Sequence, residues 1–445
     1  MATVTEVTTA PLSGLNYIDA LLDDGPAWNY LAPGTGNTIS YTFSTTGGTQ
    51  SSSSIQSAPQ AFSAAQQAAT RVALAYLSSI TGIIFAETSS GTAAKVHFAY
   101  ADIVSPNTSG LCSWGYNYSY KSGDVVTAYN ASAYIYLDNV QWGGQNSFLG
   151  GGQGLETLLH EMGHMMGLKH PFEGDIVLPA GSDTTANTLM SYTDSGGPYA
   201  SYSQYDLAAL KWLYGGDGLG GLLGVGSSGG GRYYTGTSAN DALTAGPGND
   251  ALEGAGGSDT LNGGAGTDTA IYAGARSGYA VAKSAGGYTV ADLAGGGTDL
   301  LVASERIKFA DKMLAIDIDG AGGQAYRVYQ AAFNRAPDLP GLGYWIGVMD
   351  RGVGLGEVAA NFMTSAEFIT LYGSATPSNA TLVNLLYSNV LHRAPDAAGA
   401  AYWLDVLNKG LASQAAVLAS FSDSPENYAQ VIGAIQNGFE YTPFV

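Results

Sequence analysis

The chain has 445 residues, of which 36 are acidic and 16 are Lys or Arg, so its formal net charge is −20 at pH 7. This acidity makes nucleic acid an unlikely partner, and the length predicts two to four domains. The single cysteine, Cys112, excludes a framework of intrachain disulfides. The first residues lack the basic and apolar regions of an N-terminal signal peptide, and no apolar run is long enough to predict a membrane span.

Residues 1–14 are expected to be an N-terminal extension or a short propeptide, and residues 15–215 to form one α/β domain. Apolar patterning predicts strands over residues 38–43, 96–100 and 133–137. A helix is predicted from Ser57, where Ser57 and Gln60 have the spacing of a capping box, to about Ile80, with Gly82 as its stop. A last helix is predicted over residues 204–214, before a glycine.

A helix expected to begin near Leu155 carries the most informative segment of the chain. His160 and His164 are four positions apart, so they lie on one helix face and can bind one metal ion together. Glu161 lies between them, where it can take a proton from a metal-bound water without being a ligand itself. The spacing therefore indicates catalytic metal chemistry.

Gly167 suits the left-handed turn that ends such a helix, and this turn would bring His170 back as a third imidazole ligand. Three protein ligands leave a fourth position for water, which is typical of catalytic zinc. The alternative is a pair of ordinary histidines, but three of the chain's five histidines fall in this spacing. The other two, His97 and His392, are isolated and are expected to be structural.

The segment resembles the metzincin signature His-Glu-x-x-His-x-x-Gly-x-x-His, and Leu189-Met190-Ser191-Tyr192 looks like the Met-turn of that family. The resemblance implies that Met190 forms a hydrophobic floor under the zinc histidines. It also implies that Tyr192 ligates zinc at rest and then hydrogen-bonds the oxyanion; a phenol can play either part. The element order is similar to that of the serralysins, whose substrate groove follows an edge strand, expected here near residues 111–118.

Residues 216–235 are rich in glycine and are expected to be a flexible connector. Residues 236–319 begin with a nine-residue repeat, Gly-Gly-x-Gly-x-Asp-x-Leu-x, which is the pattern of the calcium-binding β-roll of the RTX family. A glycine-rich linker would not place Asp and Leu in strict phase. Residues 288–317 are predicted to add strands that close the roll.

The repeat assigns separate tasks to its residues: the glycines permit tight turns, the aspartates supply oxygen ligands and the leucines point inward. A turn of the roll takes two repeats, so Asp241 should stack over Asp259 and Asp250 over Asp268, and each stack should enclose calcium. The candidate calcium-binding residues are Asp241, Gly246, Gly248, Asp250, Gly254, Gly257, Asp259, Gly263, Gly264, Gly266 and Asp268.

Residues 320–445 contain a duplicated helical unit, in which the Arg-Ala-Pro-Asp sequence of residues 335–338 recurs at residues 393–396. It resembles an uncharacterised helical repeat of large secreted and cell-surface bacterial proteins. Its Trp and Tyr side chains are expected to build its core rather than a ligand cage. We expect each aspartate to cap the next helix and the arginine to pair with that aspartate. Such a domain could bind a cell-surface or secreted partner.

The motifs together predict a multidomain protein with an α/β metzincin catalytic domain, a calcium-binding parallel β-roll and an all-α C-terminal repeat domain. The implied function is that of a secreted zinc endopeptidase that acts on proteins or peptides and uses zinc and calcium. Export by a type I route, without an N-terminal signal peptide, is expected. The alternative is a calcium-dependent surface or adhesion protein with a protease-like fold. We favour the enzyme because every residue that its chemistry needs is present.

Overall fold

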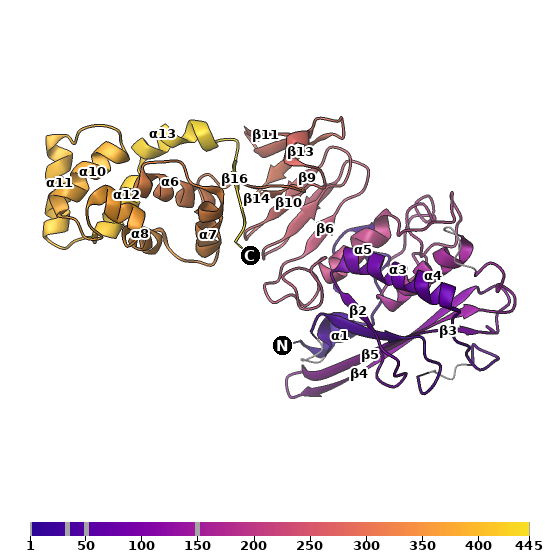
Figure 1. The fold of residues 1–445 in the computed structure, drawn as a ribbon. Coiled ribbons are helices and arrows are strands. Elements are labelled where there is room, and N and C mark those ends of the chain that lie inside the picture. Colours follow the sequence, from indigo (N-terminus) through magenta and orange to yellow (C-terminus); the bar gives the residue numbers. More distant parts are fainter. Residues whose placement is uncertain (1, 32–35, 49–52, 147–151, 445) are drawn as a thin grey trace. The chain divides into compact units, whose positions relative to one another are not determined.

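The computed structural model describes residues 2–31, 36–48, 53–146 and 152–444 (Figure 1). The chain divides into two compact units, the first made of Met1–Thr237 and Pro247–Ala251 and the second of Ser238–Gly246 and Leu252–Val445. Within the described ranges, every helix is too short or too polar to cross a membrane.

A five-stranded sheet forms the base of the first unit, with the strand order β2-β1-β3-β5-β4. The strands are β1 (Thr38–Thr42), β2 (Ile84–Glu87), β3 (Val96–Ala101), β4 (Gly110–Lys121) and β5 (Val125–Asp138). Four of them run parallel, and β4 pairs antiparallel with β5 at the edge of the sheet. The predicted strands are confirmed, and β4 includes the segment expected to be an edge strand.

The helices of the first unit are α1 (Val4–Thr8), α2 (Asn16–Asp19), the 3-10 turn η1 (Trp28–Tyr30), α3 (Ala64–Thr81), α4 (Gln153–Met165) and α5 (Gln204–Tyr214). The predicted helix stop at Gly82 is confirmed, since this residue is left-handed with a φ of 72°. The predicted helix start at Ser57 is wrong. The capping box is formed by Ser63 and Gln66 instead, because Gln60 forms a β-bridge with Tyr100 and holds the preceding residues extended.

The two segments expected to flank the catalytic domain belong to the first unit. Near the N-terminus, Val7 is fully buried, and the Val4 N–H donates to the Asp124 carbonyl at 2.9 Å. In the glycine-rich segment, the Gly218 N–H donates to the Thr81 carbonyl at 3.0 Å and the Val225 N–H to the Leu213 carbonyl at 2.9 Å. Backbone hydrogen bonds therefore fasten residues 216–235 to the ends of α3 and α5, contrary to the expectation of a flexible connector.

The roll begins in the second unit with β7 (Ala242–Thr244) and β9 (Thr260–Asn262), which pair in parallel with Leu243 opposite Leu261. Both leucines are buried, so two repeats make one turn, as predicted. The same sheet continues through β13 (Thr298–Val302), β12 (Gly287–Asp292) and β11 (Tyr279–Ser284).

A second sheet of this unit contains β10 (Thr269–Ile271), β14 (Arg306–Lys308), β15 (Met313–Ala315) and β16 (Phe439–Tyr441) in that order. Residues 288–317, predicted to add strands, contain β13, β14, β15 and most of β12. A 3-10 turn, η2 (Arg276–Gly278), precedes β11, and β6 (Tyr233–Thr235) and β8 (Ala251–Glu253) lie where the chain passes between the two units.

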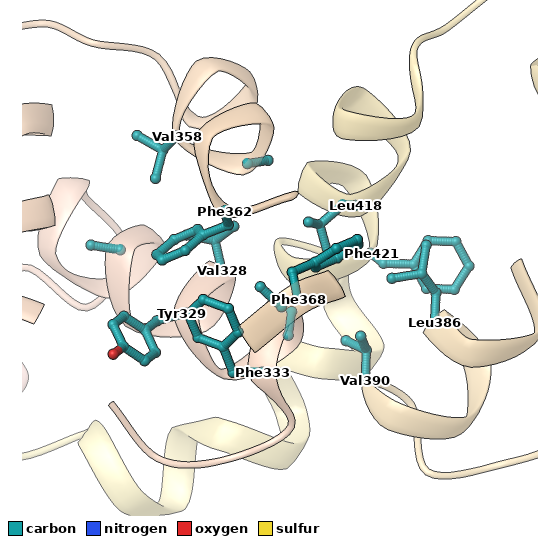
Figure 2. Packing of buried hydrophobic residues seen from close by; sticks show 14 of the residues in the cluster. Val328, Tyr329, Phe333, Val358, Phe362, Phe368, Leu386, Val390, Leu418 and Phe421 are labelled. Carbon is teal, nitrogen blue, oxygen red and sulfur yellow. The ribbon is translucent and has the colours of Figure 1, made fainter. Parts of the chain in front are cut away.

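Eight helices form the duplicated part of the second unit: α6 (Ala321–Phe333), α7 (Leu339–Asp350), α8 (Leu355–Met363), α9 (Ala366–Tyr372), α10 (Asn379–Asn389), α11 (Ala397–Asn408), α12 (Gln414–Ser422) and α13 (Pro425–Ile435). The two repeats share one core, in which Val328 and Phe362 of the first repeat and Leu418 and Phe421 of the second belong to a single cluster (Figure 2).

The Arg-Ala-Pro-Asp turns of the two repeats have the predicted caps, and each arginine pairs both with the predicted aspartate and, more closely, with a glutamate. Asp338 accepts a hydrogen bond from the Gly341 N–H at 2.8 Å and so caps α7; Asp396 caps α11 in the same way. The chief partner of Arg335 is Glu367, at 2.6 Å, while Asp338 lies 3.6 Å away. The pair with Glu367 is the stronger one because its two carboxylate oxygens accept from two nitrogens of the guanidinium group.

The expectation that the Trp and Tyr side chains build the core is confirmed for the two tryptophans and for Tyr329, Tyr372 and Tyr387, which belong to the shared core. Trp345 and Trp403 pack against the shared core, at 4.7 and 5.4 Å from the rings of Phe362 and Phe421. Tyr344 and Tyr402, one position before each tryptophan, are exposed because that side of the helix faces solvent.

The helices and the roll form one unit rather than two separate domains. β16 follows the last helix and pairs antiparallel with β15 of the roll. Ala315 belongs to the helical core, and the buried Arg306 lies 2.5 Å from Asp317 and 2.7 Å from Asp350. A boundary at residue 319 therefore cuts through shared packing.

We expect Phe439→Ala to lower the free energy of unfolding of the second unit by about 3 kcal/mol, because removal of a buried aromatic ring leaves a cavity. Phe439 is 8% exposed and lies in the strand that joins the end of the chain to the roll. Urea denaturation would measure the change. The matched control is Phe444→Ala, since Phe444 is 64% exposed, and its effect should stay within about 0.5 kcal/mol.

Candidate metal centre

Three histidines converge at the end of α4 and in the turn that follows it. His160 and His164 come from one face of α4, and Gly167, with a φ of 88°, turns the chain so that His170 returns to them. The Nε2 atom of His170 lies 3.3 Å from that of His160 and 3.2 Å from that of His164. These three are the only group of His, Cys, Asp or Glu side chains of metal-binding proximity among the described residues.

The nitrogen separations fit a tetrahedral zinc ion. Two nitrogens that are each 2.0–2.1 Å from such an ion lie about 3.3–3.4 Å apart. The opposite ring nitrogens are held by other groups: the Nδ1 atom of His160 is 2.7 Å from the Leu189 carbonyl, and that of His164 is 2.8 Å from the Leu168 carbonyl. A carbonyl can only accept, so each Nδ1 carries the proton and each Nε2 lone pair is left for a metal.

Burial also keeps the imidazoles in the form that binds metal. Desolvation lowers the pKa of His160 to about 4 and that of His164 to about 3. Both rings are therefore neutral at physiological pH, and neutral imidazole is the ligand that zinc requires. His170 differs in that its Nδ1 atom lies 3.0 Å from a carboxylate oxygen of Glu173.

Glu161 lies beside the histidines and is not a member of their group. It is 5% exposed, and burial raises the pKa of its carboxyl to about 8, an effect that the backbone N–H of Cys112 partly offsets. A Cβ atom on Gly110 would lie only 2.7 Å from a carboxylate oxygen of Glu161, so glycine at this position of β4 leaves room for the carboxylate. The site thus holds a buried carboxylate that can take up a proton.

Met190 lies under the helix that carries the metal ligands. It is fully buried, and a Cβ atom on Gly163 would meet the Met190 sulfur at 2.5 Å. Glycine at position 163 therefore allows the methionine to approach the backbone of α4. This contact agrees with the hydrophobic floor that the Met-turn resemblance implied.

The residue that sequence reasoning missed is Asp206, which holds the turn around Met190. Its carboxylate accepts hydrogen bonds from the Thr188 hydroxyl at 2.6 Å and from the Leu189 N–H at 2.8 Å. It is fully buried, and desolvation raises its pKa to about 6. The available signal was the spacing of Ser203 and Asp206, which form the capping box of α5.

Tyr192 lies over the same histidines from the far side of the turn. Its ring centroid is 4.6 Å from that of His170 and 5.9 Å from that of His160. The side chain is 68% exposed, so it can move toward or away from the metal position. Phe172 stacks on His170, with an interplanar angle of 3°, and fixes that ring.

Two cavities meet at the histidines. One, of about 250 Å³, contains all three histidines, Glu161 and the start of β4. The other, of about 520 Å³, shares His160, Glu161 and Tyr192 with it and extends along α4 to Gln153. A substrate can therefore occupy space on both sides of Glu161.

The structure places the candidate calcium aspartates in ladders of hydrogen bonds. Asp259 accepts from the Asp241 N–H at 2.8 Å, and the Asp259 N–H donates to Asp299 at 2.9 Å. Within the first unit, Asp250 accepts from the Arg232 N–H at 2.6 Å; within the second, the Asp268 N–H donates to Glu305 at 2.8 Å. Asp299 and Glu305 extend the ladders and lie outside the nine-residue pattern from which the sequence prediction was made.

At six of the seven candidate calcium-binding glycines, the structure explains why the residue is glycine. Gly248, Gly257, Gly264 and Gly266 are left-handed, with φ between 89° and 147°. Cβ atoms on Gly254 and Gly263 would lie 2.1 Å from Asp259 and 2.5 Å from Asp268, respectively. Around Gly246 there is open space, so the structure does not explain this glycine.

Comparison with known proteins finds relatives for the repeat segment, for the helical segment and for part of the chain as a whole. Residues 235–270 match the RTX calcium-binding nonapeptide repeat, and residues 325–372 and 359–431 match a domain of unknown function, DUF4214. Over 173 residues the chain is 30% identical to a serralysin of Photorhabdus laumondii. The aligned segment covers 35% of this chain and 34% of that serralysin. The chain is 27% identical over 217 residues to the metalloprotease AprA of Pseudomonas entomophila, covering 44% and 42%.

These matches fit a serralysin-type protein with an additional C-terminal domain. The chain spans between about a third and two fifths of the length of the curated relatives that it matches. The comparisons thus indicate a secreted, calcium-binding protein related to metalloproteases.

Proposed function

We propose that the first unit is a zinc-dependent endopeptidase that hydrolyses peptide bonds in proteins or peptides. The observation that carries the proposal is the set of three imidazole nitrogens, 3.2 and 3.3 Å apart, next to a buried carboxylate that is not in the set. A structural zinc site would need a fourth protein ligand and no such carboxylate.

A zinc ion held by the three histidines would polarise the scissile carbonyl and lower the pKa of a water molecule. Glu161 accepts a proton from this water and passes it to the nitrogen that leaves. Burial alone raises the pKa of Glu161 to about 8, and the positive charge of a zinc ion nearby would lower it, so that the carboxylate could accept the proton. The Tyr192 hydroxyl donates to the oxygen on which negative charge develops, and Met190 supports the histidines from below.

The test is hydrolysis of a peptide library by the zinc-loaded protein, in calcium, with and without a chelator that prefers zinc. We expect cleavage that the chelator abolishes and added zinc restores. The second candidate, a calcium-dependent surface or adhesion protein with a protease-like fold, is favoured only by the match to the RTX repeat. Zinc-loaded, folded protein that cleaves no peptide would support it.

Tyr192→Phe should lower kcat about a hundredfold and change KM little. A donor that contacts only the developing oxyanion stabilises the transition state and not the bound substrate, and loss of one such donor costs roughly 3 kcal/mol. Steady-state kinetics on one peptide measure both constants. Tyr199→Phe is a control from the same loop region, because its hydroxyl bonds to the Ser195 carbonyl instead. An increase in KM at unchanged kcat would give Tyr192 a substrate-binding role.

We further propose that the protein is secreted by a type I route and that its helical repeats bind a cell-surface or secreted partner. The RTX match and the relatives named serralysin support secretion. Removal of residues 320–444 is a poor test of the repeats, since β16 belongs to the sheet of the roll. Point variants of exposed residues such as Leu411, assayed for cell-surface retention and for peptide turnover, separate the two roles.

A further inference from the structure

Four aromatic side chains form a continuous ladder along the edge strand β4. Trp114, Tyr116, Tyr118 and Tyr120 occupy alternate positions, and alternate positions of a strand share one face. Successive ring centroids are 6.1, 6.2 and 6.1 Å apart. The alternate positions on the opposite face hold only small or polar residues, namely Ser113, Gly115, Asn117 and Ser119. The aromatic character is therefore confined to one face.

This aromatic ladder begins inside the candidate metal centre. Trp114 lines the cavity of about 250 Å³ that contains the three histidines, and so does Cys112, two positions earlier. Gly110, at the start of β4, approaches the carboxylate of Glu161. Only the first residues of β4 line this cavity, so the strand runs away from the histidines toward the turn before β5. The cleft and the aromatic ladder thus share one continuous face of the strand.

The inner end of the aromatic ladder is held rigid, and the outer end is open. Tyr116 stacks at 5.6 Å on the buried Tyr129 of β5, whose hydroxyl accepts a hydrogen bond from the Ala27 N–H at 2.9 Å. Trp114, Tyr116 and Tyr118 are half-buried, and Tyr120 at the outer end is 60% exposed. Packing within the sheet accounts for the inner rings only. Accessible aromatic rings such as those of the half-buried Tyr118 and the exposed Tyr120, on a strand that leads into a cleft, are typical of a binding surface.

The strand that carries the aromatic ladder also offers a hydrogen-bonding edge. β4 is the last strand of the sheet order, and β5 pairs with one of its sides. An extended peptide can add to the other side as a further strand, which is a common mode of peptide recognition. Alternate side chains of such a peptide repeat every 6.4–6.8 Å or so, close to the ring spacing of 6.1–6.2 Å.

We propose that the aromatic ladder is an extended substrate-binding surface, which selects peptide segments with aromatic or aliphatic side chains at alternate positions. A peptide antiparallel to β4 runs toward the histidines, because β4 runs away from them. The selected segment therefore lies on the N-terminal side of the bond that is cut. This inference rests on the proposed endopeptidase function.

The test compares three peptides with the same cleavage site. The first is short; the second has an added N-terminal segment with Phe or Leu at alternate positions; the third has Ser at those positions. We expect the wild-type protein to have a higher kcat/KM for the second peptide than for the third. In Tyr118→Ala/Tyr120→Ala this preference should fall about tenfold, since each lost ring contact removes part of the binding free energy. Tyr118→Phe should retain the preference because it retains the ring.

A matched control is Tyr402→Ala, which removes an equally exposed tyrosine, also 60%, from α11. It should leave the preference unchanged. Equal effects of the double variant on the second and third peptides would overturn the proposal. So would a preference of the ladder for an oligosaccharide over all three peptides.

Direct binding separates failure of this inference from failure of the proposed function. In the Glu161→Gln variant, the Kd of the second peptide should be lower than that of the third, and Tyr118→Ala/Tyr120→Ala should raise it about tenfold. Unchanged Kd values would overturn the ladder even if the wild-type protein cleaves peptides. Absence of cleavage by the wild-type protein, with the expected Kd values, would overturn the enzyme and leave the ladder as a peptide-binding surface.

Discussion

Replacement of Glu161 by glutamine is expected to remove nearly all peptide hydrolysis while zinc remains bound. Glu161 lies outside the group of three histidines, so its loss leaves the ligand set intact. Glutamine has the same shape but cannot accept a proton, and loss of such proton transfer typically costs about a hundredfold to ten-thousandfold in rate. The measurements are kcat on a peptide substrate and the zinc content of the purified protein.

The contrasting variant is His164→Ala, which removes a ligand rather than a base. It should lower zinc occupancy itself, since metal affinity depends on the complete ligand set. Glu161→Gln with turnover near that of the wild type would contradict the assignment. Glu161→Gln that loses zinc would make the carboxylate a ligand and not a general base.

Removal of calcium is expected to unfold the roll between about Gly236 and Asp268. The carboxylates of this segment lie close together in buried positions: Asp259 is 3% exposed and hydrogen-bonds to the backbone of Asp241. Without cations these charges repel, and glycine-rich turns contribute little order of their own. Circular dichroism and hydrogen exchange, with calcium titrated, would follow the change. Equal protection of the roll in excess chelator would contradict it.

The pH dependence of the calcium-free protein has a defined sign. Burial, together with the charges of Asp299 and Asp241, raises the pKa of Asp259 from 3.8 to about 6. The folded state therefore binds this proton more tightly than the unfolded state, and stability falls as the pH rises from about 4 to about 6. The calcium-free roll should be more protected at pH 5 than at pH 8.

Asp259→Asn tests the same physical cause, since it removes one charge and keeps the shape. It should reduce the difference in protection between pH 5 and pH 8 in chelator. The control is Asp405→Asn on α11, where the aspartate is exposed and pairs with Lys409 outside the roll. That variant should show the wild-type pH dependence.

The features that the sequence determined by itself depend on short-range geometry. His160 and His164 share a helix face because of their spacing alone, and Gly167 turns the chain because glycine adopts a left-handed backbone at little cost. The nine-residue period placed Leu243 opposite Leu261 for the same reason, because a repeated conformation stacks equivalent residues. The fold class and the candidate metal ligands could therefore be predicted from the sequence alone.

Contacts between residues distant in sequence were decided only by the tertiary structure. Ser57 and Ser63 both begin a Ser-x-x-Gln pattern, and the bridge between Gln60 and Tyr100 decided which of them caps α3. Glu367 displaced Asp338 as the chief partner of Arg335 for a similar reason, since packing of α9 brings its carboxylate into bidentate range. The pairing of β16 with β15 likewise joins strands more than a hundred residues apart. Such pairings depend on which surfaces pack together, and the spacing of residues along the sequence does not predict this packing.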